Sequence, residues 1–473
     1  MTESNKLFAK PPTIYPKRVW GNYRKLKWLS MTILFLIYYI SPFLRYDRGE
    51  NAPNQAILID LPARRAYFFG IEIWPHEVYY LAGMFILAAI GLFAVSAILG
   101  RVWCGYACPQ TVWTDLFIWV ERIVQGDRNA RMKLDKSKLS FEKIWKKGLT
   151  HFIWIIIGIF TAGAWVLYFN DAPTLLRDIL DYKISFNVAV WIAGLTFSTY
   201  VMAGFAREQV CSLMCPYARF QSAMFDKDTL VISYDKDRGE PRSNFKAGEE
   251  RTGKGDCIDC GNCVTVCPTG IDIRNGLQME CIACGLCVDA CNNVMDKVGM
   301  PRGLIRYDTE SNQEARTIAR SKSQIFKDRI RIIRPRTIYY LIIISAVSGV
   351  ILYGLLTRPS IDIVLIHDRN PLFVKLSDGS IRNNYTLKIM NMSNHDKDYS
   401  LEISGIDNPK VKIEGAGTLD KEKLPVSHDS EAEYRIMISS KESLKNKNDV
   451  KFIIKDNKTG EFATRKSPFM TGN

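Results

Sequence analysis

The 473-residue sequence lacks the motifs that mark several common classes of enzyme. It contains no glycine-rich loop that would cradle a phosphate, no flavin or nicotinamide fingerprint and no Ser/His/Asp arrangement. Cysteine is absent after position 291. We expect no cleavable signal peptide, because the N-terminal residues are polar and the first apolar run lies too far in. The sequence therefore excludes common nucleotide-dependent and hydrolytic enzymes, and any electrons it handles must come from a partner or a membrane carrier.

Long apolar runs interrupt an otherwise polar chain. An α-helix needs about 20 residues to cross the hydrocarbon core of a membrane. Five runs approach this length, and Tyr and Trp cluster at several of their ends, as interfacial anchors do. They cover residues 28–44, 79–99, 150–169, 187–206 and 338–356. We expect five membrane spans in the lipid bilayer, with a buried soluble helix as the alternative for the first and fourth runs.

Lys and Arg are distributed unevenly between the connections. The connection 101–149 holds ten Lys and Arg against five acids, whereas 170–186 holds two against three Asp. Basic connections stay on the cytoplasmic side of a membrane, so a cytoplasmic N-terminus and an external C-terminal tail are predicted. The net charge of +14 is then mainly a topology signal, and we expect no nucleic-acid partner.

Composition divides the chain into blocks of different character. In order these are a basic cytoplasmic tail (1–27), a four-helix transmembrane unit (28–206), a cytoplasmic cysteine-rich domain (207–337), a fifth transmembrane helix (338–357) and a periplasmic domain (358–473). Short segments of the last block alternate apolar and polar residues between Asn, Asp, Gly and Lys turns. This pattern predicts an immunoglobulin-like β-sandwich without the disulfide of antibody domains.

Eight of the twelve cysteines form two runs with the spacing C-x2-C-x2-C-x3-C. This is the bacterial ferredoxin spacing for two 4Fe–4S clusters, in which the fourth cysteine of each run ligates the other cluster. The first cluster is expected on Cys257, Cys260, Cys263 and Cys291, and the second on Cys281, Cys284, Cys287 and Cys267. A zinc site is the alternative, which two matched runs of this spacing disfavour. We therefore predict an electron-transfer domain of the 2×(4Fe–4S) ferredoxin type.

The other four cysteines form two Cys-x-x-x-Cys-Pro motifs at the ends of the second and fourth spans, Cys104 with Cys108 and Cys211 with Cys215. Residues i and i+4 share a face of an α-helix, and both span ends are expected on the cytoplasmic side. Four thiolates can therefore converge, and such soft ligands suit Cu(I), zinc or iron–sulfur. Buried apolar packing and a redox dithiol pair are the alternatives. His151, at the start of the third span, is a candidate additional metal ligand, although an anchoring or capping role is the commoner one.

With both kinds of motif, the sequence resembles the cytochrome c oxidase accessory proteins of the CcoG family, also called FixG or RdxA, which are polyferredoxin membrane proteins. The resemblance covers nearly the whole chain. It lies in WCGYACPQTVW, CSLMCPYARFQ, the two ferredoxin runs, the fifth span and the external immunoglobulin-like tail. The sequence departs from the ferredoxin pattern at Asn292, where Pro usually follows the second run.

The resemblance implies a role in biogenesis of the cbb-type haem–copper oxidase, at the inner membrane of a bacterium. Members of the family are thought to reduce Cu(II) to Cu(I), which would make this chain an oxidoreductase acting on metal ions. Its partners would be copper, an unidentified electron donor, copper transporters and oxidase assembly factors. The copper would be handled by Cys104, Cys108, Cys211 and Cys215.

Two other functions remain open on the sequence. Polyferredoxin membrane proteins of nitrate reduction share similar Cys-x-x-x-Cys-Pro spans, which suggests a quinol dehydrogenase without copper. The chain would otherwise be a non-catalytic copper chaperone or assembly scaffold with structural clusters. The external tail favours the accessory protein over the quinol dehydrogenase, because no such tail is expected in the latter group.

Overall fold

The computed structural model describes residues 13–49, 52–244, 252–321, 330–393, 395–406, 409–415, 417–418, 421–441 and 447–471. The chain divides into two compact units. The first unit comprises Met1–Leu44 and Gln55–Ile351, and the second comprises Arg45–Asn54 and Leu352–Asn473. All twelve cysteines belong to the first unit, which therefore positions the candidate site.

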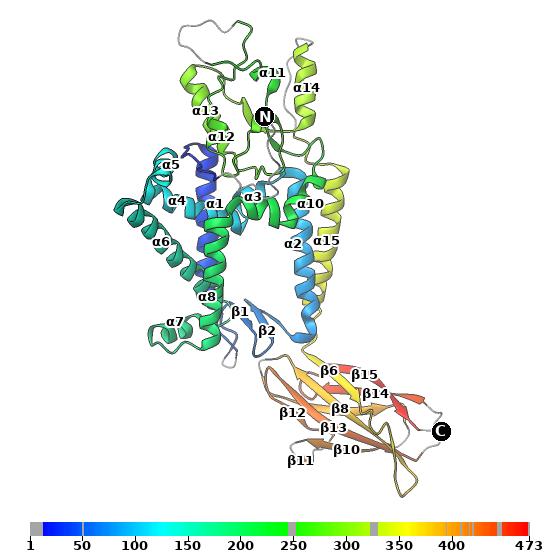
Figure 1. The fold of residues 1–473 in the computed structure, drawn as a ribbon. Helices are drawn as coiled ribbons and strands as arrows, with labels where there is room; N and C mark the ends of the chain where they lie inside the picture. Colours follow the sequence, from blue (N-terminus) through cyan, green and yellow to red (C-terminus); the bar gives the residue numbers. More distant parts are fainter. Residues whose placement is uncertain are drawn as a thin grey trace, which may run out of the picture. The chain divides into compact units, whose positions relative to one another are not determined.

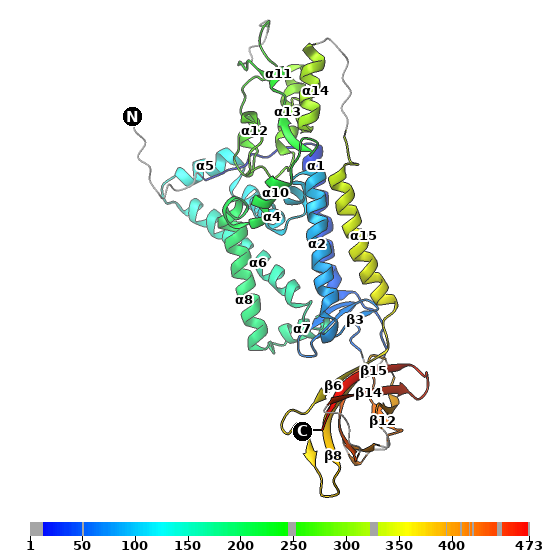
Figure 2. The ribbon, with the colours of Figure 1, turned by 90° about the vertical axis from the view of Figure 1, so that its right-hand side faces the viewer.

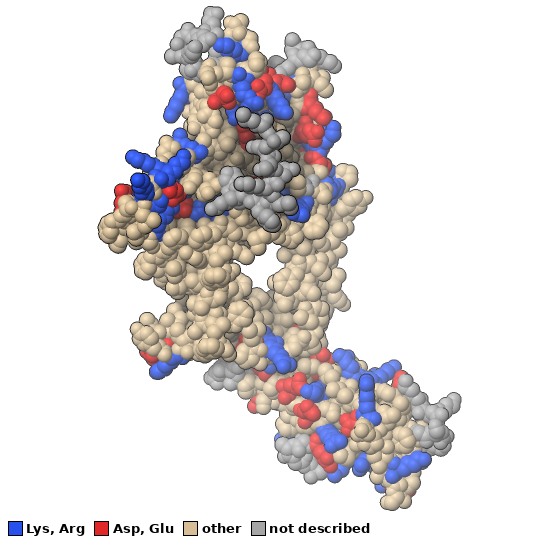
Figure 3. Space-filling view, viewed as in Figure 1, with Lys and Arg blue, Asp and Glu red and all other residues tan. Residues whose placement is uncertain are grey.

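Among the residues that the structure describes, five helices are long and apolar enough to cross a membrane. They extend over Asn22–Phe43, Pro75–Leu99, Phe141–Val166, Phe186–Met214 and Pro335–Leu356. The main helices within them are α1 (Asn22–Ile40), α2 (Val78–Leu99), α6 (Phe141–Val166), α8 (Phe186–Val201) and α15 (Pro335–Leu356). In Figure 1, α1, α2, α8 and α15 run nearly vertically and α6 runs obliquely. On the face seen in Figure 3, the surface over their middle turns is nearly free of charged side chains. Apolar helices therefore form where the five apolar runs predict them.

The ends of these helices follow from local chemistry. Ser140 and Ser185 are the N-caps of α6 and α8, and their side chains accept backbone N–H groups of the first turn. Gly100 ends α2 with a φ of +60°, and a Cβ there would lie 2.6 Å from the Leu230 carbonyl oxygen. Glycine is therefore required both by the backbone conformation and by the close approach of another segment.

The fourth apolar helix does not end near residue 206 as predicted. It continues through the π-helix η3 (Met202–Ala206), the single turn α9 (Arg207–Gln209) and a second π-helix, η4 (Val210–Met214). Arg207 has a φ of +37°, which is rare for a residue other than glycine. π-Turns insert a residue into the helical ladder and are frequent at functional sites. They carry the helix as far as Met214, so that Cys211 lies inside it.

Short helices follow two of the long ones at the end of the unit where the cysteines lie. They are α3 (Val102–Tyr106), α4 (Pro109–Gln125), α5 (Arg128–Lys136) and α10 (Pro216–Met224). In Figures 1 and 2, α4 and α10 lie between the lengthwise helices and the cysteine-rich segment. Phe117 of α4 is fully buried and stacks on Trp154 of α6 at 5.1 Å between ring centroids. These helices form a packed layer beneath the ferredoxin runs.

The ferredoxin segment surrounds a small antiparallel pair of strands. Strand β4 (Val231–Tyr234) pairs with β5 (Ile305–Asp308), with Ile232 opposite Tyr307. The remaining elements are α11 (Lys236–Gly239), α12 (Asn262–Thr265), η5 (Ile273–Asn275), α13 (Leu286–Val298) and α14 (Glu310–Ser321). Ile232, Leu304 and Met295 are almost fully buried and pack against cysteines of both runs. A hydrophobic core therefore holds the two runs together.

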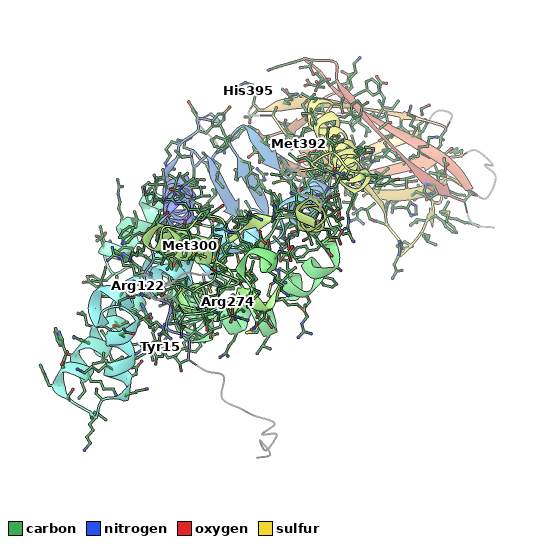
Figure 4. All side chains as sticks on the ribbon, turned by 90° about the horizontal axis from the view of Figure 1, so that it is seen from above. Tyr15, Arg122, Arg274, Met300, Met392 and His395 are labelled. Carbon is green, nitrogen blue, oxygen red and sulfur yellow. The ribbon has the colours of Figure 1, made fainter. Side chains whose placement is uncertain are left out.

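The N-terminal segment is more than the basic tail that the sequence predicts. The Lys17 amide donates to the carbonyl of Thr265, within the first ferredoxin run, at 2.8 Å. The Tyr15 hydroxyl donates to Asp135 Oδ2 of α5 at 2.7 Å, and Tyr15 is seen beside these helices in Figure 4. Arg122 of α4 donates to the Pro16 carbonyl. The segment therefore bridges the helical layer and the ferredoxin segment before α1 begins.

The opposite end of the unit contains a small sheet that the sequence analysis missed. It is formed by β1 (Ile57–Asp60), β2 (Arg65–Phe68) and β3 (Ile71–Ile73), followed by η2 (Pro75–Glu77). Helix α7 (Ala172–Leu180), which follows α6 along the chain, lies at the same end. The short helix η1 (Ser41–Phe43) follows α1. Gln55 is fully buried here and donates to the carbonyls of Ile57 and Leu167. The strands of this sheet are only three or four residues long, too short to show a clear alternation of apolar and polar residues in the sequence.

The second unit is a two-sheet β-sandwich. Its strands are β6 (Ile361–His367), β7 (Val374–Lys375), β8 (Ile381–Asn391), β9 (Lys397–Ser404), β10 (Lys410–Gly415), β11 (Gly417–Thr418), β12 (Leu424–Val426), β13 (Ser430–Ser440), β14 (Lys447–Asp456) and β15 (Phe462–Met470). One sheet has the order β11-β10-β13-β8-β6, with β7 on β8, and the other β12-β9-β14-β15. Tyr385 and Phe452 face each other across the core at 5.1 Å between ring centroids. The strands predicted from alternation in this block are present.

Candidate metal and cluster site

The two ferredoxin runs fold into the same loop. Asp259 and Ala283, each directly before the second cysteine of its run, have a φ of +51°. Gly261 and Gly285, two residues later, are left-handed with φ of +64° and +74° and begin α12 and α13. These repeated turns wrap the backbone around one side of the loop. Two independent segments thus adopt one conformation, as two equivalent cluster-binding loops require.

The structure brings the last cysteine of the first run to the second run. Cys267, Cys281, Cys284 and Cys287 line one cavity of about 20 Å³, together with Cys263. Cys281 and Cys284 are 8% and 7% exposed, and their neighbours in the cavity wall include apolar side chains such as Ile282. Thiols in an apolar recess suit an iron–sulfur cluster. This grouping is the one that the second ligand set requires, and the ligand assignment itself stays a prediction.

The other ligand set is grouped in the same crossed manner. The pKa of the Cys291 thiol is raised to about 12. Burial is the largest cause, and the charges of the Cys263, Cys257 and Cys260 thiols add to it. Cys291 of the second run is therefore close to the first three cysteines of the first run. Cys260 is exposed, whereas Cys257, Cys263 and Cys291 are buried. The first set thus reaches the protein surface at Cys260, whereas no cysteine of the second set is exposed: Cys281 and Cys284 are buried and Cys267 and Cys287 are partly buried.

The cysteines are not arranged for a single metal ion. Among the residues that the structure describes, no group of three or more His, Cys, Asp or Glu side chains lies close enough together to hold one. A 4Fe–4S cluster places each thiolate on a different iron, so its ligands are spread around a larger body. The donor set, the crossed grouping and the loop conformation therefore fit two such clusters.

The Cys-x-x-x-Cys-Pro motifs differ from the expected single helical face. Helix α3 ends at Tyr106, so Cys104 lies on α3 while Cys108 is the N-cap of α4. Cys211 lies on the π-helix η4, and Cys215 is the N-cap of α10. The expectation that each pair shares one α-helix is wrong, because the residue before a proline is pushed into an extended conformation. The two motifs nevertheless end identically, with the second cysteine at the start of a new helix.

The four motif cysteines do come together. Burial raises the pKa of the Cys104 thiol to about 12, and the Cys108, Cys211 and Cys215 thiols add to the increase, while Arg101 opposes it. All three partner thiols therefore lie within electrostatic range of Cys104. Cys104 Sγ also contacts Gln221 Oε1 at 3.5 Å. The structure groups these thiols without arranging them as ligands of one ion.

This four-thiol cluster, which comprises Cys104, Cys108, Cys211 and Cys215, adjoins the second ferredoxin run. A Cβ on Gly105 would lie 2.7 Å from the Ile282 carbonyl oxygen and 3.1 Å from Cys284 Cα. The Tyr106 hydroxyl donates to the Cys284 carbonyl at 3.0 Å. The motif backbone therefore packs directly on the loop of the second run.

Arg101 also connects the first Cys-x-x-x-Cys motif to the ferredoxin segment. It is 5% exposed and donates to the carbonyls of Met279 in the ferredoxin segment and Ala218 in α10. A guanidinium can satisfy two carbonyls at once because its donors point in fixed directions. The sequence alone did not identify Arg101 and Gly105 as functional residues. Arg101 lies three residues before Cys104 and Gly105 directly follows it, so both could have been noted as part of the motif.

His151 lies in a different environment. Its ring stacks on Phe205 at 5.9 Å and meets Trp154 edge-on at 5.2 Å between centroids. Its Nδ1 is 3.1 Å from the Tyr200 hydroxyl. These contacts show that the His151 ring packs among aromatic side chains, and they include none of the four thiols. They give no support to its predicted role as a metal ligand.

Comparison with known protein families agrees with these features. Residues 206–310 match a family model described as a 4Fe-4S dicluster domain. Residues 351–472 match an IG-like fold at the C-terminus of FixG, and residues 81–126 match a 4Fe-4S binding domain. Together with the five apolar helices, these domains define a multi-pass membrane iron–sulfur protein with an immunoglobulin-like C-terminal domain.

Three curated relatives are similar along most of their length. The nitrogen fixation protein FixG of Rhizobium meliloti is 46% identical over 89% of this chain and 84% of its own. Protein RdxB of Cereibacter sphaeroides is 48% identical over 88% and 86%, and protein RdxA of the same organism is 44% identical over 92% and 91%. The chain belongs to the FixG family, as its sequence motifs predict, and its iron–sulfur domains indicate a role in electron transfer.

Proposed function

We propose that the protein is a cupric reductase, which reduces Cu(II) to Cu(I) for assembly of a cbb-type cytochrome c oxidase. The proposal depends most on one observation, the packing of Gly105 against the Ile282 and Cys284 backbone. This contact joins a cluster of four thiols to an iron–sulfur loop. Soft thiolates favour Cu(I) over Cu(II). A site that offers them beside an electron source therefore favours the reduction.

The exposed and enclosed ligand sets suggest a direction for the electrons. When bound, each cluster supplies reversible one-electron chemistry. Cys260 is exposed, so an external donor can approach the first set there. The second set is enclosed and adjoins the four-thiol cluster through Gly105 and Tyr106. We infer entry at the first set, passage to the second and delivery of one electron to each Cu(II) substrate ion at the thiols.

The second cysteine of each motif is favourably placed to bind a cation through a thiolate. Cys108 and Cys215 are the N-caps of α4 and α10. The N-terminus of a helix favours negative charge, because its free N–H groups and its dipole point outward there. Two thiolates stabilised in this way would hold the Cu(I) product after its reduction.

The orientation and partners of the protein belong to the same proposal. The Lys and Arg content of the connection 101–149 favours the cytoplasmic side for it. The clusters and thiols would then be cytoplasmic and the immunoglobulin-like domain periplasmic, at a bacterial inner membrane. Its partners would be an electron donor, copper transporters and oxidase assembly factors.

The four-thiol cluster has a second candidate role. The match of residues 81–126 to a 4Fe-4S binding domain includes Cys104 and Cys108. Cys104 and the three thiols within electrostatic range of it also supply the ligand number of a third cluster. In this case the site would continue the electron path and would not bind copper.

One anaerobic experiment separates these roles. Protein with reduced clusters is mixed with Cu(II), and separately with a soluble quinone, while the iron–sulfur absorbance is followed. The test variant replaces Cys104, Cys108, Cys211 and Cys215 by Ser. His151→Gln is the control, because His151 contacts aromatic rings and none of the four thiols. Iron per chain is measured in every variant.

Each outcome has a distinct meaning. Rapid reoxidation by Cu(II) with Cu(I) bound, lost in the quadruple variant but kept in His151→Gln, supports the cupric reductase. A third cluster is indicated if the quadruple variant loses about four iron atoms per chain. Reoxidation by quinone with indifference to Cu(II) would identify a quinol-linked enzyme. Copper binding without any cluster reoxidation would identify a chaperone or scaffold.

A further inference from the structure

Lys27 is a buried cation at the end of the first apolar helix. It lies in the second turn of α1, and 4% of it is exposed. Its Nζ is 3.8 Å from Asp115 Oδ1 of α4. Lys27 also lines a pocket of about 30 Å³ together with Thr269, Ile282 and Cys211. It is therefore located between the second ferredoxin run and the four-thiol cluster.

The buried charges around Lys27 do not cancel. Arg24 Nη1 already donates to both carboxylate oxygens of Asp115, at 2.9 and 2.8 Å. One carboxylate thus faces two cations. Arg207 and Glu208 line the same pocket and add one charge of each sign, so one positive charge remains in excess. A second buried acid, Asp289, accepts the Arg24 amide at 2.8 Å and the Tyr23 amide at 3.3 Å, so its charge is directed to the N-terminus of α1.

This excess charge acts on the second run. Burial raises the pKa of the Cys284 thiol, and the positive charge of Lys27 is the strongest electrostatic influence that opposes the increase. Asp115 acts in the other direction and more weakly. In an enclosed site such interactions are poorly screened by water. Lys27 is therefore the main cation that acts on Cys284, whereas Arg101 is the cation that acts on Cys281.

The charges around the first run have the opposite balance. Arg274, labelled in Figure 4, is the cation that acts on Cys263. Its guanidinium is shared by two acids, Asp272 at 2.7 Å and Asp259. Two carboxylates against one cation leave a negative excess, which solvent screens in part because Asp259 is about half exposed. The charge group at Arg274, on which Arg242 also acts, thus differs in sign from the group at Lys27.

We propose that Lys27 raises the reduction potential of the cluster on Cys267, Cys281, Cys284 and Cys287 above that of the other cluster. Reduction adds one negative charge to a cluster, and nearby positive charge stabilises that state. With both clusters bound, one electron would move from the first, which would be oxidised, to the second, which would be reduced, with no proton transferred. Lys27 acts as a positioning residue that directs electrons toward the four-thiol cluster.

The test is a potentiometric titration of both clusters by EPR on the full-length holoprotein without copper. Lys27→Met removes the charge and keeps the length of the side chain. Lys27→Arg keeps the charge. Lys25→Met is the matched control, because it removes the same charge from an exposed position of the same helix. A Cys260→Ser variant assigns the first-cluster signal.

In Lys27→Met we expect the midpoint potential of the second cluster to fall and that of the first cluster to stay unchanged. We expect a tenfold or larger shift of the electron toward the first cluster, which corresponds to 59 mV for a one-electron couple. Lys27→Arg and Lys25→Met should resemble the unmodified protein. Asp115→Asn removes the opposing charge and should raise the second midpoint, which keeps the test decisive if Lys27→Met assembles no clusters.

Two results would overturn the proposal. One is an equal shift of both midpoints in Lys27→Met, which would indicate a general structural disturbance. The other is no shift in either Lys27→Met or Asp115→Asn. The inference rests on the second ligand set of the proposed function, which iron per chain tests separately. Because no copper is present, failure of copper reduction leaves the outcome unaffected.

Discussion

Replacement of Gly105 by alanine tests the contact on which the proposed function depends. The added Cβ would lie 2.7 Å from the Ile282 carbonyl oxygen, 3.0 Å from that of Ala283 and 3.1 Å from Cys284 Cα. All three are backbone atoms, so no flexible side chain can move aside. Ordinary contact begins at 3.4 Å, and the two segments must therefore separate by about 0.7 Å to relieve the closest clash.

The magnitude follows from two opposing terms. Overpacking of a well-packed region costs about 1–3 kcal/mol. Alanine is favoured over glycine in a helix by about 1 kcal/mol, and by less in a helix as short as α3. The clash should dominate, because it meets backbone on a rigid loop. We expect a net loss of about 1–2 kcal/mol in the free energy of unfolding and slower reoxidation of the clusters by Cu(II).

The assay combines thermal unfolding in detergent, iron per chain and the rate of reoxidation. Gly148→Ala is the matched control, because Gly148 lies on α6 and a Cβ there would meet no atom within 4 Å. It should be neutral or stabilise the protein by up to about 1 kcal/mol. If Gly105→Ala equals Gly148→Ala in stability, iron content and reoxidation, the thiol motif does not pack on the ferredoxin loop and the reasoning fails.

Two further changes test contacts inside each of the two units. Asp289→Ala removes the acceptor for two amides at the start of α1 and should cost about 1–2 kcal/mol in thermal unfolding of the full chain, with Asp289→Asn closer to the unmodified protein; equal effects would exclude capping. In the β-sandwich, burial raises the pKa of Asp456, but hydrogen bonds from Lys397, Thr459 and backbone amides outweigh it and hold the pKa well below its usual range. Its stabilisation is therefore complete above about pH 4 and lost as the pH falls below that. Urea unfolding of residues 358–473 should show Asp456→Asn less stable by about 1–3 kcal/mol at pH 7, with a smaller difference at pH 3; a constant difference would contradict this.

The candidate site could be predicted in its chemistry but not in its local geometry. The two ferredoxin runs have a spacing that determines their crossed grouping, and the structure brings Cys267 and Cys291 to the opposite runs. The Cys-x-x-x-Cys motifs were assigned one helical face from the i, i+4 rule. That rule fails here because Pro109 and Pro216 each begin a new helix. The four thiols converge through tertiary packing, which no local pattern encodes.

The fold shows the same division between periodic and aperiodic segments. Long apolar runs and alternating strands were recognised, because their signal extends over many residues. The three-stranded sheet of residues 57–73 was missed, because each strand has only three or four residues. The N-terminal segment was assigned to a tail from its charge, whereas Lys17 and Tyr15 bond to residues more than a hundred positions away. Such contacts depend on pairing with a distant partner and leave no periodic trace.

The two Cys-Pro steps explain how different helices produce one kind of site. Before Cys108 the chain forms the five-residue α-helix α3, and before Cys215 it forms a π-turn closed by the Cys215 amide on the Val210 carbonyl at 2.8 Å. Proline lacks an N–H and restricts the preceding residue, so both paths end with an extended cysteine. Proline is also well suited to the first position of the helix that follows. Each motif therefore terminates one helix, starts another and leaves a thiol at the new N-terminus, where negative charge is favoured. Loss of either proline should disturb the second thiol of its motif more than the first.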